Sequence, residues 1–136
     1  MFGPDSKILV VDDSLNHRQL IFDSLKKLGY KNIVTAENVN DAFTKLNGES
    51  DQGYPFDLVL SDLNMPGLSG LDFLKMVRET DKFKLIPFLL ITTESEKGAV
   101  IQAAINGVSS YIVKPFSVET LAKRLGEAWK KHNNAA

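Results

Sequence analysis

The sequence predicts an open α/β fold in which a parallel β-sheet carries helices on both faces. Short, almost wholly apolar runs bounded by turn residues recur along the chain, as expected for strands that are buried on both faces. Stretches with apolar residues at helical spacing separate these runs, so that strand and helix alternate five times. The five units fill the 136 residues, and we expect one domain over residues 1–136 with loose ends at 1–6 and 132–136.

The predicted strands combine an apolar run with a polar residue or a turn at the downstream end. The first run is β-branched and aliphatic, and the third reads FDLVLSD, so both fit the interior of a parallel sheet. Pro115 follows the fifth run and prevents its hydrogen-bonded continuation. The five predicted strands are residues 8–11, 33–36, 56–62, 87–92 and 110–113.

The predicted helices begin at capping residues and end near glycines. Ser14 and Ser69 can cap the first and third helices, and Gly29 is well placed after the first. Helical spacing is shown by Leu20, Ile21, Leu25 and Leu28 in the first helix and by Val100, Ile101, Ala104 and Ile105 in the fourth. The later helices are predicted at residues 39–46, 71–79, 96–106 and 118–131, and residues 47–55 as a polar surface loop.

Composition narrows the function classes. A net charge of -1 gives no electrostatic reason to expect binding to nucleic acid or to an anionic membrane. The absence of cysteine excludes disulfides and thiolate metal sites. No apolar run approaches the roughly 20 residues of a membrane span, and the start MFGPDSK does not resemble a signal peptide. We therefore expect a cytoplasmic protein.

Four of the five predicted strands end in residues with chemical capacity: Asp12 with Asp13, Asp62, Thr92 and Lys114. Because the carboxyl ends of parallel strands meet at one edge of a sheet, we expect these side chains to be neighbours. Close carboxylates repel one another, and a divalent cation such as Mg²⁺ removes that cost. Each residue alone also fits turn or capping chemistry. Their coincidence at successive strand ends favours a site for Mg²⁺ and a phosphoryl group.

The ordered motifs VVDDS, LVLSDLNMPGLSG, LLITTE and SYIVKPF resemble the receiver domain of two-component response regulators. The resemblance covers about residues 7–131 and extends to stand-alone chemotaxis receivers of the CheY type. It implies a flavodoxin-like (βα)5 doubly wound fold with strand order 2-1-3-4-5, of which CheY is a standard example. The spacing of the residues alone predicts only an open parallel sheet.

The resemblance implies that Asp62 is a carboxylate nucleophile, which accepts a phosphoryl group from the phosphohistidine of a histidine kinase. Asp13, Asp62 and the backbone carbonyl of Asn64 would bind Mg²⁺, with Asp12 acting mainly through a bound water. Lys114 would pair with phosphoryl oxygens. These groups would act by positioning and by neutralising charge.

The resemblance also assigns an output surface. Thr92 would hydrogen-bond a phosphoryl oxygen, and Tyr111 matches a switch aromatic whose rotamer follows phosphorylation. An ordinary strand tyrosine with a solvated hydroxyl is the alternative. In the family the bond before the equivalent of Pro115 is commonly cis. The expected partner surface includes Lys97, Val100, Ala104, Tyr111 and Lys123.

Asn64 and Glu94 lie two positions after Asp62 and Thr92. We expect both at the rim of the crevice, where their polar side chains can orient a water for attack on the phosphoryl group. The same pair occurs in fast-cycling chemotaxis receivers, and we therefore expect a short-lived phosphorylated state that decays without a separate phosphatase.

Some residues depart from the family pattern or lie outside its motifs. Leu63 stands where the best-known chemotaxis member has Trp, and Thr93 where alanine is frequent. His17 and His132 are not expected to be phosphoryl donors, because they lie on the first helix and in the tail.

The expected protein is a monomeric signalling receiver whose chemistry is limited to its own phosphorylation and dephosphorylation. Its partners would be a histidine kinase and the flagellar motor switch protein or another target protein, with neither nucleic acid nor membrane. The motifs fit equally a phosphorelay intermediate that serves a histidine phosphotransfer protein. A metal-dependent phosphatase of the haloacid dehalogenase type is more distant, because it requires an acidic residue two positions after a nucleophile on the first strand. Here Asn64 follows an aspartate on the third strand. A nucleotide-binding module would need a Gly-rich phosphate loop, which the sequence lacks.

Overall fold

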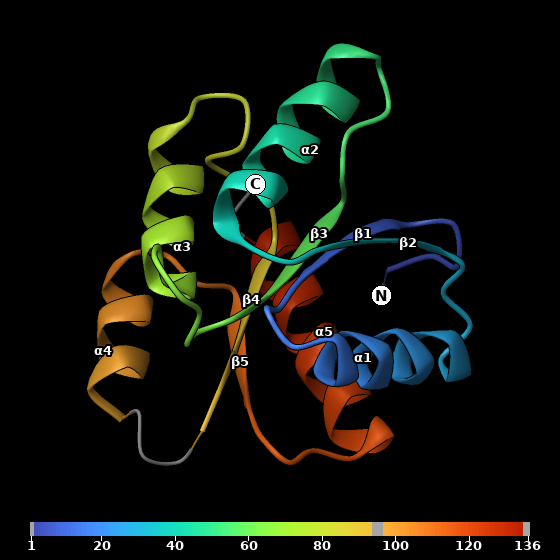
Figure 1. Cartoon of the computed structure of the whole chain (residues 1–136). Coiled ribbons are helices and arrows are strands. Elements are labelled where there is room, and N and C mark those ends of the chain that lie inside the picture. Colours follow the sequence, from blue (N-terminus) through green and yellow to red (C-terminus); the bar gives the residue numbers. More distant parts are fainter. Residues whose placement is uncertain (1, 94–96, 135–136) are drawn as a thin grey trace.

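The computed structural model describes residues 2–93 and 97–134, which form one five-stranded sheet. All neighbouring strands are parallel, and their order β2-β1-β3-β4-β5 confirms the doubly wound arrangement (Figure 1). Strands β1 and β3 lie side by side in the middle of the order although the chain forms β2 between them. The strands are β1 (Lys7–Val11), β2 (Asn32–Ala36), β3 (Leu58–Asp62), β4 (Phe88–Thr92) and β5 (Ser110–Val113).

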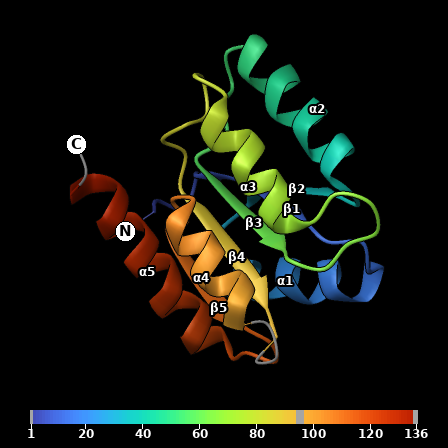
Figure 2. The same ribbon diagram turned by 90° about the vertical axis from the view of Figure 1, so that its left-hand side faces the viewer.

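The helices cover both faces of the sheet (Figures 1 and 2). Helices α1 (Leu15–Lys27) and α5 (Val118–Asn134) lie together on one face. Helices α2 (Val39–Asp51), α3 (Gly70–Glu79) and α4 (Lys97–Ile105) lie on the other. Each helix connects two parallel strands or follows the last one, as expected for a chain of βα units.

An apolar layer on each face holds the helices against the sheet. Every residue of β3 and β4 is buried. Because successive side chains of a strand point to opposite faces of the sheet, they pack alternately into the two layers. Leu9 and Val59 belong to the layer under α2, α3 and α4, whereas Ile8 and Leu58 belong to the layer under α1 and α5. Each such fully buried aliphatic side chain contributes about 1.5–3 kcal/mol to folding. The centre of the sheet is thereby fixed from both sides.

Local hydrogen bonds fix the starts of two helices beside the carboxyl edge of the sheet. The Ser14 side chain accepts the backbone N–H of His17 at 3.3 Å and caps α1. Ser69 and Asp72 form a reciprocal capping box at the start of α3. The caps predicted from the sequence are confirmed, and they belong to the helices that follow the acidic strand ends.

The spacing of apolar residues predicted the positions of α1 and α4 correctly, but it assigned some exposed residues to their buried faces. Leu20 is 63% exposed, and Ile101 and Ile105 are 61% and 71% exposed. In α1 the buried stripe is narrow and consists of Ile21 and Leu25. Apolar residues occur all round α4, so their spacing does not single out one face, and the small side chain of Ala103 provides its buried contact.

The predicted surface loop at residues 47–55 is wrong in its first half, because α2 continues to Asp51. The polar residues of this extension have weak helix propensity, but tertiary contacts compensate for it. Glu49 pairs with Lys7 at 3.0 Å, and Asp51 pairs with Lys82 at 3.2 Å. Contacts between segments distant in the sequence cannot be recognised from local spacing.

The one tryptophan of the sequence, Trp129 in α5, lies at the opposite edge of the sheet from the acidic strand ends. It is half-buried and lines a hollow of about 500 Å³ together with Phe2, Asp57 and Pro87. Asp57 and Pro87 immediately precede β3 and β4, so this hollow lies at the amino ends of the strands.

Gly70, the first residue of α3, packs directly against the end of β3. Its N–H donates to the Leu63 carbonyl at 2.9 Å. A Cβ atom at Gly70 would overlap the backbone carbonyl oxygen of Asp62 and would lie 3.0 Å from the Leu63 Cα atom. Backbone atoms cannot rotate away as a flexible side chain can. The approach of α3 to the strand end therefore requires glycine at this position.

We expect Gly70→Ala to lower the free energy of unfolding by about 1–3 kcal/mol, because the added methyl group overpacks the contact with Asp62. Gly48→Ala is the matched control, since Gly48 also lies within a helix but has no neighbour within 4 Å of a Cβ atom. That control should raise stability by up to about 1 kcal/mol. Urea unfolding followed by circular dichroism measures both. Equal effects of the two substitutions would contradict the packing argument.

Candidate functional site

Three carboxylates meet at the carboxyl edge of the sheet, as we predicted from the residues at the ends of the strands. Asp12 follows β1, Asp13 is next to it, and Asp62 is the last residue of β3. One oxygen from each lies within 4.8 Å of the others. Asp12 and Asp62 are buried, whereas Asp13 is exposed. The group is therefore held by the sheet at Asp12 and Asp62, and it is open to solvent at Asp13.

Lys114, which follows β5, reaches this acidic group. Its Nζ atom lies 2.9 Å from Asp62 Oδ1 and 3.4 Å from Asp12 Oδ2. The register explains the convergence, because Val11 pairs with Ser61 across β1 and β3, and Lys114 N–H donates to the Thr92 carbonyl at 2.7 Å. The Lys114–Pro115 peptide bond is cis.

Thr92 lies at the same edge of the sheet. It is buried as the last residue of β4, and its hydroxyl lies 3.3 Å from the backbone carbonyl of Thr93. Asn64 is exposed in the loop after Asp62. Glu94, expected at the rim of the crevice, lies outside the described residues. The structure therefore places Asn64 and Thr92 near the strand ends.

Burial raises the pKa of the Asp62 carboxyl above its usual value. The hydrogen bond from Lys114 and its positive charge oppose this shift, while the charges of Asp12 and Asp13 add to it. Lys114 thus offsets only part of the cost of three neighbouring carboxylates. The site favours the arrival of further positive charge.

The donor atoms of the acidic group suit a hard divalent cation such as Mg²⁺. The three residues supply carboxylate oxygens and no nitrogen or sulfur. Asp12 Oδ1 already accepts the Ser14 N–H at 2.9 Å, and Asp12 Oδ2 faces Lys114. Asp12 is therefore constrained, whereas the exposed Asp13 is free to turn toward an ion. With few protein ligands, such an ion keeps positions for water and for a substrate oxygen.

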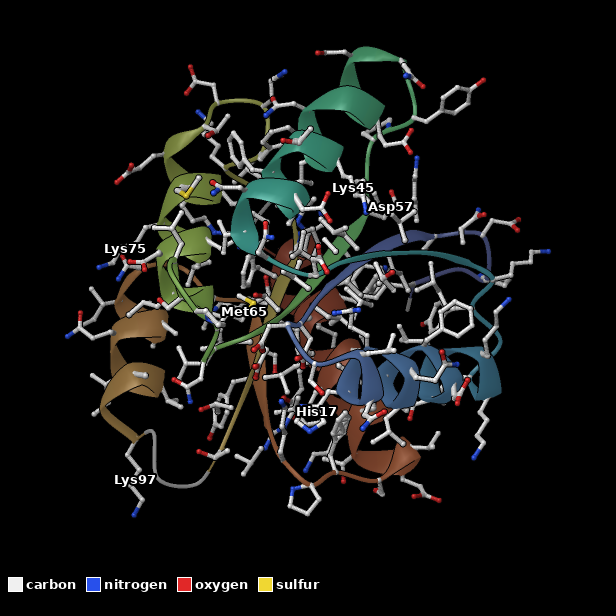
Figure 3. The ribbon with its side chains drawn as sticks, in the orientation of Figure 1. His17, Lys45, Asp57, Met65, Lys75 and Lys97 are labelled. Carbon is white, nitrogen blue, oxygen red and sulfur yellow. The ribbon has the colours of Figure 1, made fainter. Side chains whose placement is uncertain are left out.

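The residues expected at the output surface lie on α4, β5 and α5, where Lys123 is exposed. Tyr111, Lys97 and Val100 line a hollow of about 490 Å³, which also includes Thr93 and Ile101. Ala104 is exposed further along α4. The carbon of the Arg124 guanidinium lies 5.1 Å from the centroid of the half-buried Tyr111 ring, a cation–π contact. Lys97 marks the start of α4 in Figure 3.

Sequence reasoning missed two side chains of α1 that contact this site. His17 Nδ1 lies 3.2 Å from Lys114 Nζ, and Arg18 Nη1 donates to the Asp12 backbone carbonyl at 2.7 Å. Both residues belong to the first turns of α1, just after the cap Ser14. Their position could have indicated this contact, because the first turn of a helix that follows an acidic strand end lies beside that edge of the sheet.

Comparison with known proteins agrees with this geometry. Residues 8–126 match the response regulator receiver domain, which is most of the chain. The chain belongs to the response regulator receiver family. The strand order and the acidic edge described above are those that the sequence motifs led us to expect of this family.

The receiver is similar to several chemotaxis proteins over nearly the whole length of both chains. It is 43% identical to the chemotaxis protein CheY1 of Helicobacter pylori over 119 residues, covering 88% of this chain and 93% of that protein. It is 35% identical to the chemotaxis protein CheY of Pseudomonas aeruginosa, covering 93% and 98% of the two chains. The solved structure of Vibrio cholerae CheY4 superposes with a TM-score of 0.79 at 35% identity and covers 91% of this chain and 98% of its own.

Within the described residues, none of the receiver's helices combines the length and the apolar character needed to cross a membrane. This finding agrees with the sequence, in which apolar runs are short.

Replacing Asp62 should stabilise the metal-free receiver at neutral pH. We expect Asp62→Asn to raise the free energy of unfolding at pH 7 by about 1–2 kcal/mol, because it removes a buried charge that its acidic neighbours repel. The amide oxygen still accepts a hydrogen bond from Lys114. Since folding raises the pKa of Asp62, the wild-type protein loses stability as pH rises through that pKa. The difference should therefore vanish toward pH values below about 4, the ordinary pKa of aspartate.

Urea unfolding in chelator at several pH values measures this difference. Asp57→Asn is the control, because Asp57 stands before the other end of β3 and accepts the Lys7 N–H at 2.8 Å, so its replacement should not stabilise. Lower stability of Asp62→Asn at pH 7 would contradict the electrostatic account.

Proposed function

We propose that this receiver is a phosphorylation-activated response regulator, which accepts a phosphoryl group from a histidine kinase on Asp62 and signals in chemotaxis through phosphorylation-dependent protein binding. The observation that carries the proposal is the Asp62 carboxylate at the sheet edge, 2.9 Å from Lys114 and grouped with Asp12 and Asp13. The similarity to chemotaxis proteins that match nearly their whole length supports the cellular role.

In the proposed reaction an oxygen of Asp62 attacks the phosphorus of a phosphohistidine on the kinase. The new P–O bond forms as the P–N bond breaks, and the electron pair of that bond leaves with the donor imidazole. The product is an acyl phosphate, which water later hydrolyses back to the carboxylate and inorganic phosphate. Asp62 must be ionised for the attack, and the ammonium of Lys114 favours that form.

Lys114 positions and stabilises the transferred group. Its ammonium already donates to Asp62 Oδ1, so a phosphoryl group on Asp62 brings oxygens within reach of the same donor. A Mg²⁺ ion held by Asp12, Asp13, Asp62 and the Asn64 backbone carbonyl would supply further neutralisation of the phosphoryl charge. Thr92 would hydrogen-bond a phosphoryl oxygen after its hydroxyl leaves the Thr93 carbonyl.

The proposed output surface is formed by α4, β5 and α5. Tyr111 is half-buried beside the α4 hollow, so its ring has space to change its packing when Thr92 is drawn toward the phosphoryl group. The flagellar motor switch is the proposed target. A phosphorelay role, with transfer to a histidine phosphotransfer protein, is the alternative, because the same acidic site would serve it. Asn64, with Glu94 outside the described residues, is proposed to adjust the lifetime of the phosphorylated state.

Phosphorylation should occur on Asp62 alone. With Mg²⁺ and acetyl phosphate, the protein should gain one phosphate by intact mass spectrometry, and Asp62→Asn should gain none, because the amide is not a nucleophile. Asp57→Asn, a carboxylate change at the far end of β3, should be labelled like the wild type. Full labelling of Asp62→Asn would refute the assignment of the acceptor.

The output surface should respond to occupation of the site. Beryllofluoride with Mg²⁺ mimics the phosphoryl group, and we expect amide shifts at Lys97, Val100, Ala104 and Tyr111 as well as near Asp62. Two-dimensional ¹H–¹⁵N NMR measures them, with Asp62→Asn as the control that should show none. Shifts confined to α1 and the acidic strand ends would count against α4 and β5 as the output surface.

A further inference from the structure

His17 contacts Lys114 but has no role in the reaction proposed above. Figure 3 shows this residue at the start of α1, beside the carboxyl edge of the sheet. Its Nδ1 atom lies 3.2 Å from Lys114 Nζ and 3.7 Å from Asp12 Oδ2. The backbone of His17 is fixed because its N–H donates to the capping Ser14 side chain at 3.3 Å. The ring is therefore presented to Lys114 by a defined helix start.

The ammonium of Lys114 has three N–H donors and no acceptor. Three acceptors surround it: Asp62 Oδ1 at 2.9 Å, His17 Nδ1 at 3.2 Å and Asp12 Oδ2 at 3.4 Å. A hydrogen bond from the ammonium to His17 Nδ1 requires a lone pair on Nδ1, which is the tautomer with the ring proton on Nε2. A proton on Nδ1 would instead point at Asp12 over the longer distance and would oppose the nearer ammonium. The contact with Lys114 is the shorter of the two, and it is a hydrogen bond only when Nδ1 is the acceptor.

A neutral acceptor suits this position. A carboxylate in place of His17 would add a fourth negative charge to a group that already holds three. An apolar residue would leave one donor of Lys114 to solvent. The imidazole offers a lone pair without adding charge, and it connects α1 to the end of β5. The ring also lines a hollow of about 450 Å³ with Leu20, Ile21 and Phe116, whose side chains are apolar.

We propose that His17 is a positioning residue, which holds the ammonium of Lys114 in place while its contact with Asp62 is exchanged for a contact with the transferred phosphoryl group. The proposal rests on the function proposed above. When Asp62 becomes an acyl phosphate, its oxygen no longer carries the charge that attracts Lys114. His17 Nδ1 and Asp12 Oδ2 retain two of the three N–H donors, and the third turns to a phosphoryl oxygen. The lysine is thereby already oriented before the group arrives.

The test compares His17→Leu, which removes the acceptor, with His17→Asn, whose side-chain oxygen can occupy the place of Nδ1. The dissociation constant of beryllofluoride in Mg²⁺ should rise about tenfold in the leucine variant, the effect of losing one hydrogen bond to a charged group. It should stay within about threefold of wild type in the asparagine variant. Asn16→Leu, an exposed change in the same helix turn, is the matched control and should bind like wild type.

A second measurement avoids the metal and the phosphoryl mimic. In chelator, the ¹H–¹⁵N signal of the Lys114 side chain should be visible in the wild type and in His17→Asn, because three acceptors slow its exchange. It should broaden or disappear in His17→Leu. Urea unfolding checks that all variants are folded.

The outcomes separate this proposal from the previous one. Wild-type affinity and an unchanged Lys114 signal in His17→Leu would overturn the role of His17. An equal loss in the asparagine and leucine variants would overturn it too, because ring packing and not the acceptor would then be responsible. Failure of the wild-type protein to bind beryllofluoride or accept phosphate would refute the proposed function, while the metal-free Lys114 signal would still show whether His17 holds the lysine.

Discussion

An excess of negative charge at the carboxyl edge of the sheet is the constraint on which this structure depends. Asp12, Asp13 and Asp62 approach one another closely, and Lys114 pairs with only two of them. Left alone, such a group would move apart or take up protons. It stays together because β1 and β3 are packed on both faces and cannot separate. The energy of the apolar layers thus maintains an arrangement that a bound cation and phosphoryl group would relieve.

Main-chain hydrogen bonds also hold the reactive groups in position. Asp12 N–H donates to the Ala36 carbonyl at 3.1 Å, and Leu63 N–H donates to the Ile91 carbonyl at 2.8 Å. These bonds continue the ladders of the parallel sheet past the last strand residues and hold both acidic strand ends. Because these backbone bonds do not depend on residue type, they hold the strand ends without requiring any particular side chain.

The sequence was sufficient for the fold class and for the convergence of Asp12, Asp62 and Lys114, because both follow from strand alternation and from the geometry of parallel sheets. It was insufficient where contacts between segments distant in the sequence determine the local structure. The last turns of α2 depend on partners such as Lys7, and the exposed face of α4 depends on how the helix lies on the sheet.

The contact of His17 with Lys114 was missed for a related reason. The two residues lie at opposite ends of the chain, and they meet only because β1 and β5 both finish at one edge. The sequence around a single histidine on a helix does not indicate such a long-range contact.

The position of Trp129 has a consequence for how the protein can be observed. Strand β3 has five residues, so the amino edge where Trp129 lies is roughly 16 Å from Asp62 along the strand direction. The residue that follows Asp62 is the buried aliphatic Leu63, which does not fluoresce. Intrinsic tryptophan emission therefore reports the environment of α5 and the amino-terminal segment, and it does not report the acidic edge directly. An optical reporter of this site has to be introduced near Asp62.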